Sequence, residues 1–453
     1  MEILDSALSR DINKIISSSN DFKRQYWTLD FHSPVDTIAA FKVISIDRIC
    51  DYESNFTDEI IVRLLVPLGK YSYRIYPYLD HLEATLYRFN PKSDVTQMLE
   101  GAQSDSSERF VVTVINPPAP AVEMNHTNQP SEGALDVMNF MTLDIQLINK
   151  AVNQMRMRAV GGSFRDCNSA DVIKYLLTSE SQKIEVSSEY LPKGVDMIPP
   201  TDPVKRKHIV IPQGTRLVDV PNYIQKHCGG VYSTGLSYYF QNDTWFVHPS
   251  YDTARYDTTE KILTIINVPA NKMPGIEKTY ILDGNHLSVI ATGETKVANT
   301  SEKLLLNEGN GVRFADANKF MESFVETTDN KAIASRGRTN NEFITVTRGD
   351  GDNNVMISNN PINANPMMEY SKLAARDGVM VLMSWENSDP SLIYPGMPVR
   401  MKYLDGEEIR EIDGVVLKVH HYIQLGKDGI FTSRHLSTTN IALFVKRSIF
   451  KKK

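Results

Sequence analysis

The stretch from residue 391 to residue 445 limits the possible folds most, because it contains the clearest strand pattern in the chain. Apolar residues alternate with other residues along it, Asp405 and Gly406 can form one tight turn, and residues 426–429 can form a second. The predicted strands cover residues 399–404, 409–419, 415–425, 430–436 and 441–445. Antiparallel strands this short bury an apolar face only against one another, so the stretch predicts most of a small barrel or sandwich.

A second run of strands is predicted near the other end of the chain, after an amphipathic helix over residues 3–16. The prolines of residues 117–120 interrupt this run, because proline cannot donate to a strand ladder. The predicted strands are residues 27–31, 41–49, 59–66, 71–76, 82–89, 110–115, 143–147 and 155–159. They indicate an N-terminal β domain that ends near residue 160. The helix could cover an edge of its own barrel or contact a partner.

The middle of the chain has the pattern of a small α+β unit. Asn168 or Ser169 can cap a helix with an apolar face, and Asp219 can cap a second helix that ends before Gly229 and Gly230. Residues 235–240 and 244–248 then read as an aromatic hairpin. Strands are predicted again at 262–268, 278–282, 287–292 and 379–385, with helices at 315–325 and 367–376.

Two parts of the chain resemble the baseplate central hub proteins of contractile-tailed bacteriophages, which are related to the N-terminal hub part of type VI secretion spike proteins. In the C-terminal part the resemblance lies in residues 395–399, PGMPV, and residues 414–421, GVVLKVHH. In the middle it lies in residues 169–177, of the form S-x-D-V-I-x-x-L-L, and in the hairpin LSYYFQNDTWFVHPSYD of residues 236–252. The matches cover roughly residues 165–255 and 391–445. The N-terminal domain shares only its predicted fold class, a β-barrel, with the family.

The resemblance implies a mainly β fold with α+β parts, in which two antiparallel, tail-tube-like β-barrel domains accompany smaller α+β domains. The domains expected from it and from the pattern are an N-terminal helix or arm (1–24), an N-terminal barrel (25–160), an α+β domain with the aromatic hairpin (161–256), strands contributing to the second barrel (257–300), a mixed helical and loop insertion (301–378) and a C-terminal barrel with a basic tail (379–453).

The function that the resemblance implies is structural. A ring-shaped homotrimer would offer six similar barrels, join a hexameric tail tube to a trimeric central spike, contact other baseplate proteins and line the channel through which DNA is ejected. The protein would then be part of a virion tail baseplate assembled in the cytoplasm of the host bacterium. A tail-associated cell-wall hydrolase and the hub of a non-viral contractile injection system are the alternatives.

Sequence motifs for catalysis or cofactors do not occur in the chain. Glycine-rich phosphate loops and the HExxH and GxSxG patterns are absent, and the three cysteines, Cys50, Cys167 and Cys228, lie too far apart for a metal-binding spacing. His420 and His421 are neighbours on a predicted strand and point to opposite faces, so they cannot bind one ion together. We therefore expect no enzyme, no cofactor, no metal site and no catalytic residue.

Charge and hydropathy argue against two further classes of protein. The formal net charge of −6 argues against a dedicated nucleic-acid binder, and the chain has no apolar run long enough to form a membrane segment. DNA is expected to pass without specific binding. The candidate contacts to other subunits or to the spike are Leu8, Ile12, Lys451, Lys452 and Lys453.

Overall fold

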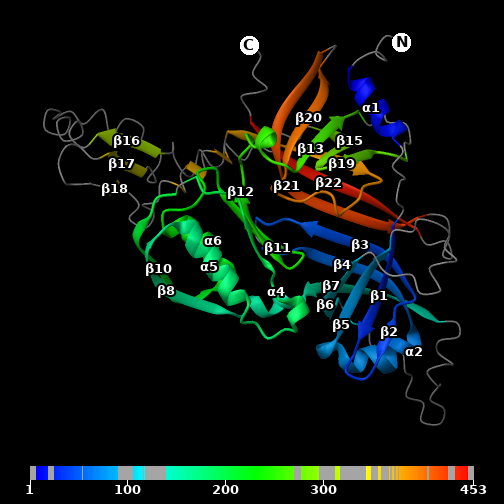
Figure 1. The fold of residues 1–453 in the computed structure, drawn as a ribbon. Helices are drawn as coiled ribbons and strands as arrows, with labels where there is room; N and C mark the ends of the chain where they lie inside the picture. Colours follow the sequence, from blue (N-terminus) through cyan, green and yellow to red (C-terminus); the bar gives the residue numbers. More distant parts are fainter. Residues whose placement is uncertain are drawn as a thin grey trace.

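The computed structural model describes most of the two β regions and the unit between them. The described residues are 7–18, 25–53, 55–89, 106–115, 117, 139–201, 203–269, 277–294, 312–316, 343–347, 356–358, 367, 370–371, 374–375, 377–405, 408–426 and 434–446. Figure 1 shows three bodies built from them: a first barrel in blue and cyan, an α+β unit in green, and a second barrel formed by green, orange and red strands.

The first barrel is a six-stranded sheet that closes through a bent strand. Its elements are β1 (Tyr26–His32), β2 (Thr37–Ala39), β3 (Lys42–Cys50), β4 (Glu59–Pro67), β5 (Glu83–Phe89), β6 (Ser106–Val114) and β7 (Phe140–Asn149), in the order β2-β1-β5-β6-β7-β4-β3. β2 and β3 are separated only by Ala40 and Phe41. Ala40 N–H donates to Leu29 of β1 (2.9 Å) and Phe41 N–H donates to Leu65 of β4 (3.0 Å). The strand thus pairs with β1 before the bend and with β4 after it, as strands do where a sheet turns a corner.

The second barrel is closed by continuous pairing. Its elements are β13 (Ile262–Asn267), β15 (His286–Glu294), β19 (Gly378–Glu386), β22 (His435–Lys446), β21 (Glu408–Leu425) and β20 (Pro398–Asp405), and β14 (Tyr280–Asp283) is added outside β15. Each of the six pairs with the next, and β20 pairs back to β13. Closure leaves no free edge in this barrel, and its core holds Trp385, Leu443 and Val399 at 0% exposure.

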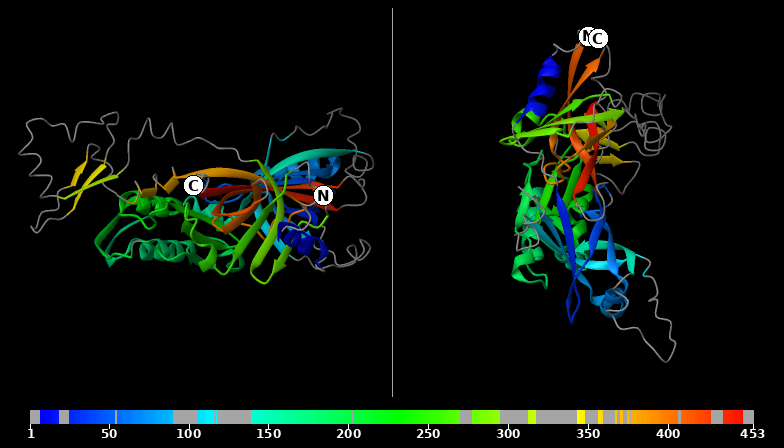
Figure 2. Two further views of the ribbon diagram at one scale, coloured as in Figure 1. Left: turned by 90° about the horizontal axis from the view of Figure 1, so that it is seen from above. Right: turned by 90° about the vertical axis from the view of Figure 1, so that its right-hand side faces the viewer.

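The two barrels share one ladder. The second half of β21 pairs with β3 of the first barrel, from Val419 opposite Cys50 to Gln424 opposite Ser45. The first half of the same strand pairs with β20, and the register shifts between Val416 and Lys418. A bulge bends a strand and increases its twist, so β21 can leave one barrel and enter the other. The right-hand view of Figure 2 shows the barrels one above the other, with the α+β unit on one side.

The α+β unit lies against one side of the two barrels. It consists of α4 (Lys150–Met155), β8 (Ala159–Cys167), α5 (Ser169–Ser181), η5 (Ser188–Tyr190), β9 (Gly194–Met197), β10 (Arg206–Arg216), η6 (Leu217–Asp219), α6 (Val220–His227), β11 (Leu236–Gln241), β12 (Thr244–Pro249) and η7 (Tyr256–Thr258). α5 and α6 pack between the β8–β10 ribbon and the sheet β11-β12-β9 around a separate core, in which Trp245 and Ile173 are fully buried. Asn168 caps α5 as predicted, because its side chain accepts from Asp171 N–H at 2.7 Å.

The predicted fold class is confirmed, and one detail of pairing differs from it. β13 runs parallel to both β15 and β20, so the second barrel is not purely antiparallel. Parallel neighbours need a crossover connection, and here β13 and β20 are separated by more than a hundred residues of sequence. The strands expected at 262–268 and 287–292 belong to the second barrel, as the resemblance implied.

Several local predictions were wrong. Residues 71–76 form helical turns, within α2 (Leu68–Lys70), η2 (Tyr71–Ile75) and η3 (Tyr76–His81), instead of a strand. Tyr71 and Ile75 are both fully buried, and their spacing of four places them on one helical face, although the aromatic residues also fit an alternating pattern. Met155 ends a helix, α4, and Ala159 begins β8, so residues 155–159 are no strand of the first barrel; the Asn149 side chain caps α4 by accepting from two backbone N–H groups. The first barrel therefore ends at Asn149, and β8 pairs with β10 instead of closing the barrel.

Three further differences concern strand length and helix ends. The C-terminal stretch forms three strands, β20, β21 and β22, because residues 408–425 make one continuous strand, while residues 427–433 lie outside the described part. Residues 312–316, where the helix over 315–325 was expected to begin, form β16 (Val312–Asp316), which pairs with β17 (Phe343–Thr347) and through it with β18 (Met356–Ser358). Asp219 does not cap α6 with its side chain, because its carboxylate accepts from Arg216 Nε at 2.7 Å.

Gly396 holds the second barrel against the aromatic hairpin of the α+β unit. Its φ of +88° is a left-handed conformation, and a Cβ atom there would lie 2.6 Å from the His248 ring. Its carbonyl oxygen accepts from Arg255 Nη2 at 2.6 Å, and its N–H donates to Val416 at 2.8 Å. This contact gives the PG pair of the C-terminal motif a structural role.

We expect Gly396→Ala to lower the free energy of unfolding by more than the roughly 1–2 kcal/mol that a left-handed alanine alone costs, because the methyl group also displaces His248. The matched control is Gly284→Ala, since Gly284 also has a positive φ (+59°) but has no atom within 4 Å of its Cβ position. Denaturant unfolding of both variants measures the difference. Equal losses for the two variants would contradict the role of the His248 contact.

Candidate interaction face across the two barrels

One outward surface runs without a break from the second barrel onto the first. Cross-strand partners form a row from Thr292 on β15 through Ser384, Asn440 and His420 to Ile49 on β3. Cross-strand partners lie on the same face of a sheet, while their neighbours along each strand lie on the opposite face. The neighbours Met383, Ile441, Val419 and Cys50 are accordingly at 3% exposure or less. We call the outward side of β15, β19, β22, β21 and β3 the trans-barrel face.

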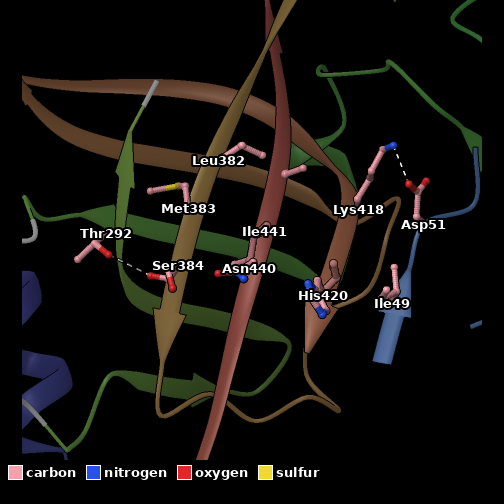
Figure 3. Close-up of a pocket in the computed structure, with 12 residues that line it drawn as sticks. Ile49, Asp51, Thr292, Leu382, Met383, Ser384, Lys418, His420, Asn440 and Ile441 are labelled. Carbon is pink, nitrogen blue, oxygen red and sulfur yellow. Dashed lines mark hydrogen bonds and ion pairs between the residues drawn. The ribbon is translucent and has the colours of Figure 1, made fainter. Parts of the chain in front are cut away.

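A shallow groove of about 470 Å³ lies on this face (Figure 3). The residues around it are Ile49, Asp51, Thr292, Leu382, Met383, Ser384, Lys418, Val419, His420, Asn440, Ile441 and Ala442. Leu382 is 41% exposed at its rim, and Tyr422 and Leu436 of the same face are about as exposed. An exposed apolar area bordered by polar groups is typical of a surface that contacts another molecule.

The charged side chains Lys418 and Asp51 of the groove are paired with each other. Lys418 Nζ donates to Asp51 at 2.7 Å and to Glu53 at 2.8 Å, and Figure 3 shows the first of these contacts. Burial lowers the pKa of Lys418, but the hydrogen bonds to both carboxylates outweigh it and the pKa is raised. His420 contacts Asp47. The charge of Lys418 in the groove is thus neutralised locally.

Beside the trans-barrel face, on the neighbouring strand β4, Arg63 lies opposite Ser45 of β3 and donates to Asp144 of β7 through two nitrogens, Nε to Oδ1 at 2.8 Å and Nη2 to Oδ2 at 3.0 Å. The hydrogen bonds from Arg63 lower the pKa of Asp144. This pair lies on the first barrel, so local pairing of charge extends over both barrels.

Ser384, His420 and Asp47 do not form a catalytic triad in the groove. Strand β22 lies between the strands that carry Ser384 and His420. Ser384 and His420 form no hydrogen bond with each other in the described structure, and the Nε2 atom of His420 contacts Asp47 instead, whereas a nucleophile and its base must be within hydrogen-bonding distance. Among the described residues no group of three or more His, Cys, Asp or Glu side chains could hold a metal ion.

A buried ionic cluster lies behind the face, where β3, the β3–β4 loop and the aromatic hairpin meet. Arg48 Nε donates to Asp58 Oδ2 at 2.6 Å, Gln241 Nε2 donates to the same oxygen at 3.1 Å, and Tyr52 O–H donates to Asp58 Oδ1. Burial raises the pKa of Asp58, but the Arg48 charge and the three hydrogen bonds outweigh it and hold the pKa below its usual value. The cluster joins the first barrel to the α+β unit.

His421 is buried on the core side of β21, at 2% exposure, with Nδ1 2.9 Å from Thr439 Oγ1. Burial lowers its pKa to about 3, and the nearby positive charge of Arg48 acts in the same direction. The prediction that His420 and His421 point to opposite faces is confirmed by the cross-strand register and by their different burial.

The candidate contact residues predicted from the sequence are only partly described. Helix α1 (Ala7–Ser17) packs on the second barrel, where Leu8 is 8% exposed and lies in a cluster with Ile266 and Ile290, and Ile12 is partly buried against it. Asp11 bonds Lys402 Nζ at 3.0 Å. The helix therefore covers a barrel of its own chain, but this is the second barrel and not the first barrel that follows the helix in sequence. A partner contact of Leu8 or Ile12 stays a prediction, and Lys451, Lys452 and Lys453 lie outside the described residues.

The trans-barrel face and the ionic cluster were not predicted from the sequence. Lys418 and Asp51 are 367 residues apart in sequence, and Gln241 and Asp58 are 183 apart. Only the alternation within β21, which separates His420 from His421, carried a signal for the face.

No protein-family model and no curated protein matches the sequence. None of the helices among the described residues combines the length and the hydropathy needed to cross a membrane. Classification therefore depends on the fold, which is a pair of fused six-stranded barrels with an α+β unit between their sequence segments.

Solved structures do match. A tail protein from Neisseria meningitidis MC58 is similar at 11% identity with a TM-score of 0.45, covering 94% of this chain and 98% of that one. The 43 kDa tail protein of prophage MuSo2 from Shewanella oneidensis is similar at 9% identity and a TM-score of 0.43, covering 91% and 96%. A component of the type VI secretion system of E. coli is similar at 6% identity and a TM-score of 0.39, covering 91% of this chain and 75% of that one.

These are phage tail and type VI secretion proteins, the two kinds of protein that the sequence motifs resemble, and the predicted resemblance is therefore confirmed. None of the three reaches 25% identity or a TM-score of 0.5, and none assigns a function to this chain.

Proposed function

We propose that this chain is a structural subunit of a phage-tail-like baseplate, acting as a hub between the tail tube and the central spike. The observation that carries the proposal is the pair of closed six-stranded barrels joined by the β3–β21 ladder. Three copies of such a subunit supply six barrels. A ring of six similar barrels can stack on a hexameric tube and still present threefold symmetry to a trimeric spike.

The trans-barrel face fits the wall of the channel in such a ring. It extends over both barrels, so a ring of three subunits would repeat it three times and present six barrels in all. Lys418 on the face and Arg63 on the neighbouring strand β4 are each held by a carboxylate. Affinity for DNA comes largely from cations that neutralise phosphates, so a surface of paired charges lets DNA pass without binding it tightly. The net charge of −6 agrees with this role.

The proposed partners are a second and third copy of the chain, a tail tube protein, a central spike protein and other baseplate proteins. The proposed location is the tail baseplate of a virion assembled in the cytoplasm of the host bacterium. The proposed role needs no catalysis. The rival function of a cell-wall hydrolase needs a nucleophile and base, paired carboxylates or a metal, and the groove on the trans-barrel face brings together none of these among its described residues.

We expect the purified protein to form a trimer. Light scattering over a concentration series should give a molar mass near three times 51.2 kDa for the protein alone, or, if the protein alone is smaller, a complex that contains three copies of it once tube or spike protein is added. A chain that stays monomeric or dimeric in the presence of both partners would contradict the proposal.

Electron microscopy of the same sample provides the second test. End-on class averages should show a ring with a central hole and six nearly equivalent lobes, because each subunit contributes two barrels of the same strand number. A threefold ring with only three lobes would show that the second barrel of each subunit lies outside the ring, and the pairing with a hexameric tube would then fail. Hydrolysis of purified peptidoglycan by the protein would favour the enzyme instead.

A further inference from the structure

The three buried histidines among the described residues all lie where the second barrel contacts the rest of the protein. They are His421, His435 and His248, which are 2%, 2% and 7% exposed. His81 in η3 and His208 on β10, which lie away from these contacts, are exposed. We call the contacts of the second barrel with the first barrel and with the α+β unit the barrel boundary.

His421 and His435 lie between the two barrels. On β21, His421 has Arg48 of β3 as its cross-strand partner on one side and Thr439 of β22 on the other, and its Nδ1 lies 2.9 Å from Thr439 Oγ1. His435 begins β22 of the second barrel, but its Nε2 lies 3.0 Å from the Val43 carbonyl oxygen of β3 in the first barrel. Both rings therefore take part in the contact that fuses the barrels.

His248 lies between the α+β unit and the second barrel. It belongs to β12, and its ring packs on Gly396, which precedes β20, so closely that a Cβ atom on Gly396 would lie 2.6 Å from the ring. The ring centroid of Tyr239 on β11 lies 5.8 Å away, and Tyr239 O–H donates to the Pro395 carbonyl oxygen at 3.2 Å. The aromatic hairpin thus meets the second barrel around this ring.

Charged groups around the three rings disfavour a positive charge on them. Burial is the largest cause that lowers each pKa, and a basic side chain acts in the same direction at each ring: Arg48 at His421, Lys42 at His435 and Arg255 at His248. At His421 the neighbouring His420 adds to this effect and Asp58 opposes it, but Asp58 already accepts from Arg48 Nε at 2.6 Å.

Hydrogen bonding at two of the rings also leaves no place for a second proton. His435 Nδ1 and His248 Nε2 are buried and have no hydrogen-bond partner among the described residues. A proton added to either nitrogen would be buried without an acceptor. Ion pairs cross the boundary as well, Lys418 with Asp51 at 2.7 Å and Arg88 with Asp389 at 3.5 Å. Model carboxylates titrate near pH 4 and model histidines near pH 6.5, so the two kinds of group are separable by pH.

The parts on either side of the barrel boundary have their own means of staying folded. The second barrel closes through the β20–β13 pairing, and the first barrel closes through the bend between β2 and β3, so neither needs the β3–β21 ladder for closure. The α+β unit is tied to the first barrel by the Gln241–Asp58 hydrogen bond at 3.1 Å. The Tyr52 ring also stacks on Tyr239, with 4.2 Å between the centroids.

We propose that the second barrel separates from the first barrel and the α+β unit in mild acid, while each of these bodies keeps its own fold. Above about pH 6.5 the three rings are neutral and fit the closed boundary. As the pH falls toward 5, opening lets water reach the rings, and each ring takes up a proton from solvent that the closed contact disfavours. This proposal concerns contacts within one chain and does not depend on the ring assembly proposed above.

The buried thiol of Cys50 reports opening of the boundary, because Cys50 of β3 is 1% exposed and lies opposite Val419 of β21. A pyridyl disulfide that reacts with thiols in acid labels the full-length protein at pH 7 and pH 5. Mass spectrometry gives the rate at Cys50, which is divided by its rate in urea at the same pH. Each of the three histidines should raise the open fraction about twentyfold between these pH values, so the normalised rate should rise more than about a thousandfold.

The variant Val62→Cys separates opening of the boundary from unfolding of the whole chain. Val62 is fully buried in the core of the first barrel, on β4. At pH 5 the normalised rate at Cys50 should exceed that of the thiol introduced at position 62 at least about tenfold, because opening of the boundary leaves the core of the first barrel intact. Equal normalised rates at the two thiols would overturn the proposal, since both would then react only in the unfolded chain.

Histidine variants test the cause. His421→Gln, His435→Gln should reduce the rise at Cys50 to about twentyfold, the share of His248. The matched control His81→Gln, His208→Gln removes two exposed histidines away from the boundary and should leave the rise unchanged. A normalised rate at Cys50 that is the same at pH 7 and pH 5 in the unmodified sequence, or an equal reduction by the two double variants, would also overturn the proposal.

Discussion

Replacing Asp58 by alanine is expected to destabilise the protein by about 3–5 kcal/mol, because it leaves the charge of Arg48 buried and largely uncompensated. The Arg48 and Asp58 side chains are 15% and 5% exposed, and Arg48 Nη2 lies 2.5 Å from Asp58 Oδ2. In the variant only Glu108, 3.2 Å from Arg48 Nη1, would still balance the guanidinium charge. Tyr52 O–H and Gln241 Nε2 would also lose their acceptor.

The measurement is urea unfolding followed by a probe in the first barrel, for example the fluorescence of Trp27, which is 6% exposed. Asp144→Ala is the matched control. It also removes an aspartate from an arginine pair, but Arg63 and Asp144 are 55% and 36% exposed, so the expected loss is about 0–1 kcal/mol. The double variant Arg48→Met, Asp58→Leu should recover most of the stability lost by Asp58→Ala. Losses within about 1 kcal/mol of each other for the two alanine variants would show that the buried cluster does not hold the junction together.

The second large effect is acid destabilisation well above the range in which carboxylates titrate. Burial lowers the pKa of His421 to about 3 and those of His248 and His435 to about 4. The unfolded chain binds a proton at each histidine with a pKa near 6.5. Stability from the three neutral histidines is therefore complete above about pH 6.5 and is lost as the pH falls from 6.5 toward 4.

The expected size follows from proton linkage. Near pH 5 the unfolded chain holds nearly three more protons than the native chain at these sites, so the free energy of unfolding should fall by about 4 kcal/mol per pH unit. The surroundings of His435 agree with its lowered pKa. Its Nε2 lies 3.0 Å from the Val43 carbonyl oxygen, and its Nδ1 is buried with no hydrogen-bond partner among the described residues. A proton added to that nitrogen would have nowhere to bond.

Denaturant unfolding at several pH values between 7 and 4.5 measures the slope. His421→Gln should reduce it by about a third, because one of three such groups is removed. Asn440→Gln, on the neighbouring strand, removes no titratable group and should leave the slope unchanged. A stability that stays flat from pH 7 to pH 5 would mean that these histidines are already protonated or solvated in the native protein.

Local sequence patterns determined most of the individual elements. The alternation from Val399 onward predicted the strands that form β20 and β21, and the Asn168 cap predicted the start of α5. The turn residues between β11 and β12 predicted a hairpin, in which Asn242 and Asp243 have positive φ. These features depend on residues that are close in sequence, where periodicity and capping act directly. The prediction was wrong at Tyr71, because Tyr71, Tyr73 and Ile75 occupy every second position, which is the pattern of a strand. The same residues also fit a helix, in which Tyr71 and Ile75, four positions apart, share one buried face.

Only the tertiary structure decided how those elements form a site. The sequence predicted that residues 415–425 pair within their own hairpins, but the second half of β21 also pairs with β3, nearly four hundred residues earlier, and so fuses two barrels into one face. It gave no sign that Asp58 would meet Gln241, or that Arg165 would lie opposite His208. Strand edges and charged side chains can pair with many partners of similar local chemistry. Which partner they take is set by closure of the barrels and by packing of the whole chain, and the local pattern of residues contains neither.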